Sequence, residues 1–379
     1  MSFTLLTPPE SLRLGTLQTT HGLIETPNFM PVGTKATVKG IDVERLRESG
    51  AQITLVNTYH LWLRPGPERI QKLGGIQKFS GWHGPILSDS GGYQVFSLKG
   101  MRKLSEEGVE FQSHLDGSKQ FLSPEKAVWI QETLGVDIAM VLDECPSPGQ
   151  PIEDLKRSLD MTHRWAARCL AARAHPDKTQ LFGITQGGGH RSLRTESAQI
   201  LSEMPFNGMA IGGLSVGEPK EVMYDVLSYH PSQLPANKVR YLMGVGTPED
   251  IVTAVKFGVD IFDCVMPTRS GRFGRAFIRG EEPFINIRNT KFALDDTPLD
   301  PTCHCVACRN YSKAYLHHLF KVDEMLGPQM LSAHNIYHYL QLMRDVRAAI
   351  KAGTFEELYQ RIKATWASTI HCSKSNITV

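Results

Sequence analysis

The sequence has almost no excess charge of either sign. Its 41 lysine and arginine residues nearly balance 39 aspartate and glutamate residues, which leaves a formal net charge of +2. No global field therefore attracts nucleic acid or an anionic membrane, and any site for a polyanion must be a local patch. The sequence also lacks an apolar run of about 18 residues and a cationic start followed by an apolar segment. We expect a soluble, cytoplasmic protein without membrane contact.

Cysteine is scarce, and its distribution is uneven. The seven cysteines are an odd number for a secreted disulfide framework, and three of them, Cys303, Cys305 and Cys308, fall in the motif CHCVAC. Three thiolates this close favour Zn²⁺, which takes four S or N ligands in structural sites. The spacing leaves four candidates for the fourth ligand: His304, His317, His318 and His334. Three cysteines and one histidine would leave no open position, so we expect one structural zinc per chain.

Short apolar runs recur along the chain, each followed by a polar or glycine-rich turn and then a helical stretch. The eight runs are 23–33, 50–58, 85–89, 136–143, 180–186, 206–213, 239–246 and 259–263. Helices are expected at 124–134, 152–173, 190–203, 218–229 and 248–257. Eight such repeats predict an α/β fold, a (β/α)8 TIM barrel whose strands are apolar on both faces. A doubly wound open sheet would show the same alternation, but no GxGxxG motif opens a helix after the first strand.

Three segments depart from the repeat. Run 23–33 is the weakest strand, because Pro27 and Pro31 cannot donate to a ladder. Segment 102–122 alternates around Asp116-Gly117 and predicts an inserted β-hairpin. After residue 263 the pattern breaks, and amphipathic helices are expected at 335–352 and 354–367. We expect one barrel domain over 1–379 that carries the hairpin, a zinc-binding subdomain over 290–340 and C-terminal helices over 341–379.

In a barrel of this kind, chemistry collects where strands end. Three apolar runs end in the carboxylates Asp89, Asp143 and Asp263. Two nearby carboxylates suit glycosyl transfer, in which one attacks the anomeric carbon and the other moves protons. Gly91-Gly92 and Gly212-Gly213 would let a flat ligand approach backbone amides.

A basic strip follows Asp263 in the chain. Between Thr268 and Lys291 six bases stand against two acids; the bases are Arg269, Arg272, Arg275, Arg279, Arg288 and Lys291. A solvated loop would have the same composition. The position of the strip, beside a strand-end carboxylate and the cysteine motif, favours phosphate contacts.

Several longer motifs point to a known family. They are SDSGGYQVFSL (88–98), DEC (143–145), GITQGG (183–188), AIGGLSVGE (210–218), YLMGVGTPED (241–250), FDCVMPTRSGR (262–272) and CHCVAC (303–308). From about residue 15 to about residue 365, the chain closely resembles the bacterial tRNA-guanine transglycosylases of the queuine tRNA-ribosyltransferase family. The resemblance implies a zinc-containing barrel enzyme, a pentosyltransferase of queuosine biosynthesis. Such enzymes exchange the wobble guanine of tRNAs with GUN anticodons (Asp, Asn, His and Tyr) for a 7-deazaguanine base.

The resemblance also implies roles for individual residues. Asp263 matches the nucleophile that forms a covalent tRNA intermediate, and Asp89 matches the residue of proton transfer. Base recognition would fall to Asp143, Gln186, Gly213 and Leu214, with the ring between Tyr93 and Met243 and the Leu214-Ser215 peptide supported by Glu218. Arg269 and Arg272 would grip the anticodon. The zinc ligands would be Cys303, Cys305, Cys308 and His334.

Two further features concern substrate and assembly. Cys145 and Val216 match the bacterial pattern, in which a valine admits 7-aminomethyl-7-deazaguanine and crowds out the larger queuine. Tyr311, Tyr315 and His318 are spaced to share one face of a helix. Such an aromatic stripe is typical of a buried core as well as of an interface. Because the family is homodimeric, we expect this stripe to pack against a second copy.

Two other function classes remain to be weighed. A non-catalytic tRNA-binding subunit of the family would lack one or both of Asp89 and Asp263, and both are present. A zinc-dependent barrel hydrolase would need strand-end histidines, for which His60 is the sole candidate.

Overall fold

The computed structural model describes residues 2–97 and 102–374, and the chain forms two compact units. The first unit contains residues up to 36, 52–245 and 254–263. The second contains 37–51, 246–253 and the residues from 264 on. The predicted subdomain over 290–340 lies within the second unit, and its own boundaries stay a prediction.

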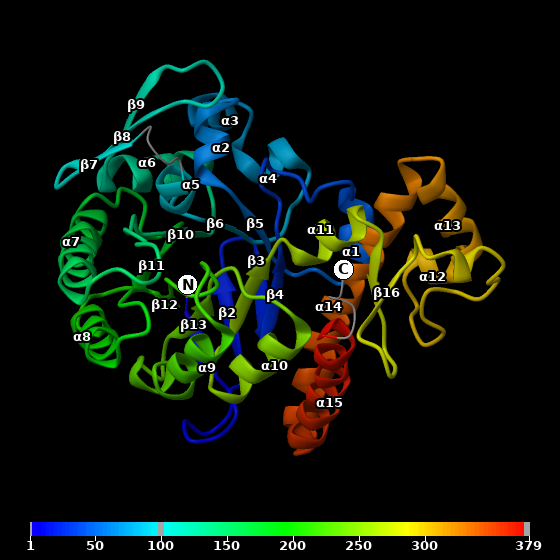
Figure 1. Ribbon diagram of the computed structural model, residues 1–379. Coiled ribbons are helices and arrows are strands. Elements are labelled where there is room, and N and C mark those ends of the chain that lie inside the picture. Colours follow the sequence, from blue (N-terminus) through cyan, green and yellow to red (C-terminus); the bar gives the residue numbers. More distant parts are fainter. Residues whose placement is uncertain (1, 98–101, 375–379) are drawn as a thin grey trace. The chain divides into compact units, whose positions relative to one another are not determined.

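The first unit is built on a barrel of eight parallel strands (Figure 1). In barrel order the strands are β4 (Asn28–Pro31), β5 (Thr54–Val56), β6 (Ile86–Ser88), β10 (Ile138–Met140), β11 (Gln180–Thr185), β12 (Gly208–Ile211), β13 (Val239–Leu242) and β14 (Ile261–Cys264). β4 pairs with β14, and a parallel bridge between Val32 and Leu55 joins β4 to β5. Seven of the eight predicted runs contain one of these strands in full, and run 259–263 contains all of β14 except its last residue, Cys264, so the predicted (β/α)8 barrel is confirmed.

The first run differs from its prediction. Residues 22–26 belong to a separate antiparallel sheet of β1 (Phe3–Leu5), β2 (Gly15–Thr19) and β3 (Gly22–Thr26), and the barrel strand starts only at Asn28. Pro27 separates the two because it has no N–H to donate. His21 donates its backbone N–H to Asp137, and Gln180 donates to the carbonyl of Gln18. Both partners lie where β10 and β11 begin, so the small sheet covers the amino-terminal end of the barrel.

Segment 102–122 forms three antiparallel strands, one more than the expected hairpin. They are β7 (Arg102–Ser105), β8 (Gly108–Gln112) and β9 (Lys119–Leu122). Asp116-Gly117 makes the turn between β8 and β9, where Asp116 accepts the backbone N–H of Ser118 and Gly117 has a φ of 72°. Asp in such a turn bonds the backbone two residues on, and Gly tolerates the left-handed conformation.

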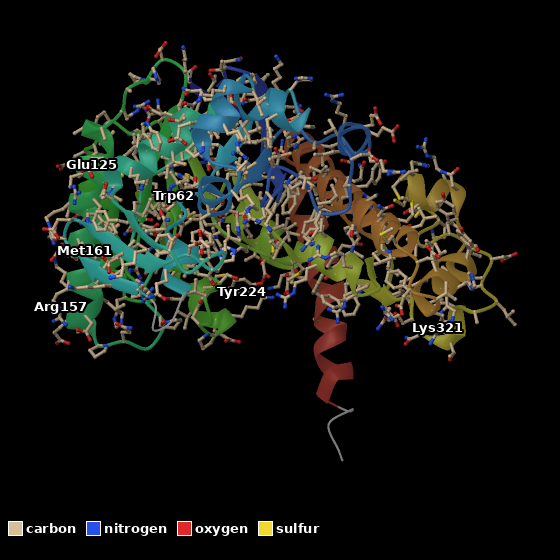
Figure 2. All side chains as sticks on the ribbon, turned by 90° about the horizontal axis from the view of Figure 1, so that it is seen from above. Trp62, Glu125, Arg157, Met161, Tyr224 and Lys321 are labelled. Carbon is tan, nitrogen blue, oxygen red and sulfur yellow. The ribbon has the colours of Figure 1, made fainter. Side chains whose placement is uncertain are left out.

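The helices between the strands begin and end close to the predicted residues. Those of this part of the chain are α2 (Thr58–Leu63), α3 (Pro67–Lys72), α4 (Gly75–Ser80), α5 (Gly92–Ser97), α6 (Pro124–Leu134), α7 (Ile152–Ala171), α8 (Arg191–Ser202), α9 (Lys220–Tyr229), η1 (Pro231–Gln233) and α10 (Pro248–Lys256). α6 starts at Pro124 because Ser123 caps it, accepting the N–H of Lys126 at 3.2 Å. In Figure 1, α7 and α8 lie outside β10–β12, and Figure 2 labels Glu125 and Arg157 on the outer side of α6 and α7.

The second unit is mainly helical. Its elements are α1 (Val43–Glu48), α11 (Met266–Arg272), β15 (Arg275–Phe277), β16 (Phe284–Asn286), η2 (Thr290–Phe292), α12 (Val306–Asn310), α13 (Lys313–Lys321), α14 (Leu326–Ala352) and α15 (Phe355–Lys374). α11 packs against α14 without a gap: a Cβ on Gly271 would lie 2.6 Å from the backbone nitrogen of Ser332. α14 begins nine residues before the expected start at 335. Pro328 does not prevent this, because a proline in the first turn removes no helical hydrogen bond.

Candidate active site and metal centre

Six of the barrel strands carry predicted site residues at or just after their carboxyl ends. Asp89 follows β6, Asp143 lies three residues after β10, Gln186 follows β11, Gly213 lies two residues after β12, Met243 follows β13, and Asp263 lies near the end of β14. Parallel strands in a closed barrel end on one rim. The topology therefore brings these residues to the same end of the barrel, although the chain separates the first and last by more than 170 positions.

Asp89 accepts hydrogen bonds from four donors, which come from the segment after β5, the loop after β6 and helix α5. Its Oδ1 accepts the backbone N–H groups of Thr58 at 3.0 Å and Gly91 at 3.1 Å. Its Oδ2 accepts Asn57 Nδ2 at 2.6 Å and Gln94 Nε2 at 3.3 Å. Burial, with a smaller contribution from the charge of Asp263, nevertheless raises the pKa of Asp89 to about 7 against the effect of these donors. A carboxyl with this pKa can both give and take a proton near neutral pH.

Asp263 is held through one oxygen. Its Oδ1 accepts the hydroxyl of Tyr241 at 2.6 Å and the backbone N–H of Gly244 at 2.7 Å. Within the described residues, no hydrogen bond reaches Oδ2, so this oxygen keeps its lone pairs for another partner. Burial raises the pKa of Asp263, and the two donors lower it. The geometry is that of a carboxyl group oriented through one oxygen, with its other oxygen available to a ligand.

Asp143 and Gln186 form a buried polar pair. Gln186 Nε2 donates to Asp143 Oδ2 at 2.6 Å, and burial raises the pKa of Asp143 to about 6. Gln186 Oε1 is buried and accepts no hydrogen bond within the described part of the chain. A buried acceptor without a donor is costly in a finished core. Such an atom fits a site that a ligand N–H completes.

The glycines beside these residues leave no space for a side chain, and the expectation that they also let a flat ligand approach backbone amides stays a prediction. A Cβ on Gly213 would lie 2.3 Å from Gln186 Oε1, and a Cβ on Gly212 would lie 2.7 Å from Gln186 Nε2. On Gly92 a Cβ would lie 3.1 Å from the carbonyl of Asp143. These positions need glycine because the neighbouring strand ends approach so closely.

The loop after β12 is held in a strained conformation. Ser215 has a φ of 59°, which non-glycine residues rarely adopt. Glu218 accepts the backbone N–H groups of Ser215 and, at 2.9 Å, Val216. These bonds fix the Leu214-Ser215 peptide, and strain of this kind concentrates at functional sites.

The remaining predicted residues of the rim differ in exposure. Tyr93, on α5, is 56% exposed, Met243 and Val216 are half-buried, and Leu214 is buried. Cys145 is half-buried, and burial raises the pKa of its thiol to about 12, so it stays protonated at neutral pH.

Sequence patterns had singled out neither Asn57 nor Tyr241 nor Arg194. Asn57 donates to Asp89, and Tyr241 donates to Asp263. Asn57 directly follows β5, and Tyr241 lies within β13. Their position at or near a predicted strand end is the signal that could have identified them. Arg194 is fully buried on α8 and donates to the carbonyls of Gly188 at 2.8 Å, Thr185 at 3.4 Å and Gly213 at 3.4 Å. Through these hydrogen bonds, Arg194 on α8 fixes the backbone of the loops after β11 and β12.

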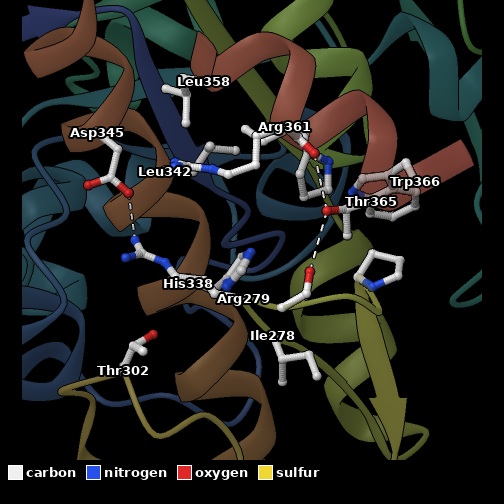
Figure 3. Close-up of a pocket in the computed structure, with 14 residues that line it drawn as sticks. Ile278, Arg279, Thr302, His338, Leu342, Asp345, Leu358, Arg361, Thr365 and Trp366 are labelled. Carbon is white, nitrogen blue, oxygen red and sulfur yellow. Dashed lines mark hydrogen bonds and ion pairs between the residues drawn. The ribbon is translucent and has the colours of Figure 1, made fainter. Parts of the chain in front are cut away.

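The basic strip lies in the second unit, and most of its charges have local partners. Figure 3 shows Arg279 directed at Asp345, 2.6 Å away, beside a hollow of about 410 Å³ between α14 and α15. Three other cations of the strip lie over aromatic rings: Arg275 over Phe284, Arg288 over Phe320 and Lys291 over Phe292. Arg269 and Arg272 have no ion-pair partner among the described residues. The strip thus offers two uncommitted guanidinium groups, fewer than the composition suggested.

The cysteine motif converges with His334, which comes from α14. The Nδ1 of His334 lies 3.7 Å from the Sγ of Cys303, 3.4 Å from that of Cys305 and 3.3 Å from that of Cys308. Tetrahedral Zn²⁺, with bonds of about 2.3 Å to S and about 2.0–2.1 Å to N, separates S and N by about 3.6 Å. His334 Nε2 donates to the carbonyl of Phe277 at 2.6 Å, which leaves Nδ1 free to bind a metal. The four groups therefore fit a closed metal site.

The other histidines are placed differently. His304 and His318 are exposed, and His317 Nδ1 contacts the carbonyl of Ile287 at 2.7 Å. His60, the candidate for a hydrolytic metal site, packs edge-on against Tyr59 and His114. Among the described residues, the set with His334 is the sole His, Cys or acidic group with metal-binding geometry.

The aromatic stripe is not one helix, which corrects its prediction. α12 ends at Asn310, and α13 starts at Lys313 because Ser312 caps it, accepting the N–H of Tyr315 at 3.1 Å. Tyr311 lies in the break. The rings of Tyr311 and Tyr315 still stack, with centroids 5.4 Å apart, and Tyr315 and His318 are exposed.

A (β/α)8 barrel whose carboxyl-terminal rim carries three aspartates with raised pKa values fits the class of barrel enzymes. The queuine tRNA-ribosyltransferase family matches residues 10–368 of this chain. A protein of that name from Symbiobacterium thermophilum is 51% identical over 359 residues, which cover 95% of this chain and 89% of the relative. Another, from Novosphingobium aromaticivorans, is 53% identical over 358 residues, which cover 93% and 95%. The chain belongs to the queuine tRNA-ribosyltransferase family of enzymes.

Proposed function

We propose that this enzyme exchanges the wobble guanine of tRNAs with GUN anticodons for 7-aminomethyl-7-deazaguanine. The observation that carries the proposal is the pair Asp89 and Asp263: both are half-buried at strand ends on one rim, close enough for the charge of one to raise the pKa of the other. One has a pKa of about 7, and the other keeps an oxygen without a partner among the described residues. The family membership supplies the substrate class.

In the first half-reaction, Asp263 Oδ2 attacks C1′ of the wobble nucleotide. The C1′–N9 bond breaks, guanine leaves with that electron pair, and protonated Asp89 supplies a proton to the leaving base. The product is a covalent ester between Asp263 and the tRNA. Tyr241 and the N–H of Gly244 keep the attacking carboxylate oriented through its other oxygen.

In the second half-reaction, Asp89 is ionised and takes the N9 proton of the incoming base. N9 then forms a bond to C1′, the Asp263–C1′ bond breaks, and the carboxylate returns to its starting state. A pKa near 7 suits this double role, because both protonation states of Asp89 are well populated at neutral pH.

Base recognition falls to Asp143, Gln186, Gly213 and Leu214. The unpartnered Gln186 Oε1 accepts an N–H group of the base, and Tyr93 and Met243 sandwich its ring. Glu218 holds the peptide that faces the 7-substituent. Cys145 and Val216 border that substituent and select aminomethyl over the bulkier group of queuine.

The second unit supplies binding and structure. Arg269 and Arg272 contact tRNA phosphates, because their guanidinium groups are uncommitted. Cys303, Cys305, Cys308 and His334 hold one structural Zn²⁺, which cross-links α14 to the 303–308 segment and takes no part in the chemistry. Tyr315 and His318 contact a second copy in a homodimer, and Tyr315→Ala should shift native mass spectrometry toward monomer while metal stays bound.

No helix in the described ranges has the length and apolarity to cross a membrane. We propose a cytoplasmic location, where tRNA is found.

The test is base exchange with radiolabelled guanine and a GUN-anticodon tRNA. Label should enter this tRNA and should not enter one whose wobble base is not guanine. Unlabelled 7-aminomethyl-7-deazaguanine should suppress incorporation more strongly than queuine does. A purified, folded enzyme that incorporates no guanine would refute the proposal.

A further inference from the structure

One hollow of the second unit has no role in the proposed function. It lies between α14 and α15, entirely within that unit, and has a volume of about 410 Å³ (Figure 3). Small-molecule sites in proteins have volumes of about 300–1,000 Å³. None of the residues assigned above to catalysis, base recognition, tRNA contact or metal binding lines this hollow, which we call the α14–α15 pocket.

Two helical stripes line the pocket. On α15, Leu358, Ile362 and Trp366 are spaced four residues apart and share one face of the helix, as His338 and Leu342 do on α14. A helix normally buries such a stripe against another element. Here the two stripes meet across a hollow, which leaves room for an apolar ligand between them.

The aromatic rings of the pocket are held in place by a buried phenylalanine. The side chain of Phe277 is 1% exposed, and its ring stacks on His338 with centroids 6.1 Å apart and on Trp366 with centroids 6.4 Å apart. The ring of Trp366 also lies 6.2 Å from that of Phe284. Side chains that are already ordered lose little conformational entropy when a ligand packs on them. The pocket therefore offers a preformed surface on which a flat ring can stack.

The charges of the pocket leave one guanidinium without a partner. Asp345 is the sole acid that lines it in the described ranges, and both of its oxygens are engaged: Oδ2 accepts Arg279 Nη2 at 2.6 Å, and Oδ1 accepts Gln341 Nε2 at 2.8 Å. Arg361 lines the same hollow from α15, and its guanidinium has no ion pair or hydrogen bond with any described residue. A planar guanidinium matches the two oxygens of one carboxylate.

We propose that the α14–α15 pocket binds a small planar aromatic carboxylate. The ring of the ligand lies between the two stripes and stacks on Trp366, and its carboxylate pairs with Arg361 at the exposed edge of the pocket. The lining favours a carboxylate over a phosphate, because one uncommitted guanidinium balances a single negative charge, whereas a phosphate carries nearly two. The inference goes beyond the proposed function and shares no residue with it.

The test follows binding at the pocket itself by fluorine NMR. The full-length, metal-loaded protein is labelled with 5-fluorotryptophan at its five tryptophans, and Trp366→Phe identifies the resonance of Trp366. The probe 2-naphthoate should shift this resonance saturably by millimolar concentration, where a ligand of this size is expected to bind. Its neutral analogue 2-naphthamide should bind about 5-fold more weakly, because it lacks the charge that pairs with a partly exposed cation.

Two variants test the position of the carboxylate. Arg361→Gln should bind 2-naphthoate only as tightly as the wild type binds 2-naphthamide, and its affinity for the amide should be unchanged. Lys363→Gln is the matched control, because Lys363 is a cation of the same helix that lies over the ring of Tyr359 and does not line the pocket. This control should bind both probes as the wild type does.

Three results would each overturn the inference. The Trp366 resonance could stay in place with both probes, or respond to the two probes with equal affinity. Alternatively, Arg361→Gln and Lys363→Gln could bind 2-naphthoate equally well. A shift confined to the other four tryptophans would place the ligand elsewhere and count against the pocket in the same way.

Discussion

The barrel rim and the cysteine–histidine cluster differ in whether their polar atoms have partners. At the rim, Gln186 Oε1 is buried without a donor and Asp263 Oδ2 has no partner among the described residues. In the cluster, the thiols of Cys303, Cys305 and Cys308 converge on one nitrogen of His334, and its other nitrogen is bonded to a carbonyl. The rim is incomplete without a ligand, whereas a metal alone completes the cluster.

This difference indicates that the rim acts in the reaction, whereas the cluster acts in the stability of the fold. Buried polar atoms without partners and raised pKa values destabilise a fold, and they persist where chemistry uses them. A cluster with every ligand position filled has no place for substrate, and its metal contributes to folding. Substitutions at the rim should therefore change turnover with little effect on folding, and substitutions in the cluster should do the reverse.

The largest effect is expected for Asp263→Asn. Loss of the nucleophile should lower exchange by on the order of 10³-fold or more, while the midpoint of thermal unfolding changes little. The covalent tRNA complex, seen with the wild type on a denaturing gel, should disappear. If the variant forms this complex at wild-type levels, another residue is the nucleophile. Asp89→Asn is the matched control, because it should lose turnover more than tRNA binding.

The opposite result is expected for Cys305→Ala. Metal content should fall from about one Zn²⁺ per chain, and the free energy of unfolding should decrease by more than about 4 kcal/mol, as expected when a structural metal is removed. Metal analysis and denaturant unfolding measure the two changes on one sample. His334→Ala should behave alike; full occupancy in that variant would show that another residue is the fourth ligand. His318→Ala is the control with unchanged metal.

A third comparison lies within the basic strip. Arg269→Ala with Arg272→Ala should raise the KM for tRNA and reduce the slope of log binding against log salt by about 2, one for each phosphate that the variant no longer binds. The KM for guanine should not change. Arg279→Gln is the control, because its guanidinium is committed to Asp345. Equal effects of the double variant and the control would show that the strip is a solvated surface without specific phosphate contacts.

Sequence reasoning recovered the barrel because its strands and helices are specified locally. Ser123 and Pro124 specify the start of α6 by local contacts alone, independent of the rest of the chain. Eight buried strands likewise require eight apolar runs in the sequence. It missed the separate sheet at residues 3–26, because pairing partners depend on contacts far along the chain. It also joined the aromatic stripe into one helix, although the cap at Ser312 starts a new one.

At the candidate site, sequence patterns placed the strand-end carboxylates on one rim, since topology alone brings strand ends together. They could not give the environments that distinguish those carboxylates. Asp89 has four donors and Asp263 two, and this follows from side chains such as Asn57 and Tyr241, which come from other strands or loops. For the same reason spacing could not choose His334 over His317.

The smallest effect tests the environment of Asp89 directly. Asn57 donates the shortest of its hydrogen bonds, at 2.6 Å, and a donor stabilises the ionised carboxyl. Asn57→Ala should raise the pKa of Asp89 above its value of about 7, by about one unit if the bond to the charged group is worth about 1.5 kcal/mol. The first half-reaction needs protonated Asp89, so kcat/KM for tRNA falls as the pH rises through this pKa. In the variant this fall should move to higher pH. Gln94→Ala, which removes a longer bond of 3.3 Å, should move it less. A pH profile that stays in place, or moves to lower pH, would mean that Asp89 is not the group whose proton the first half-reaction consumes.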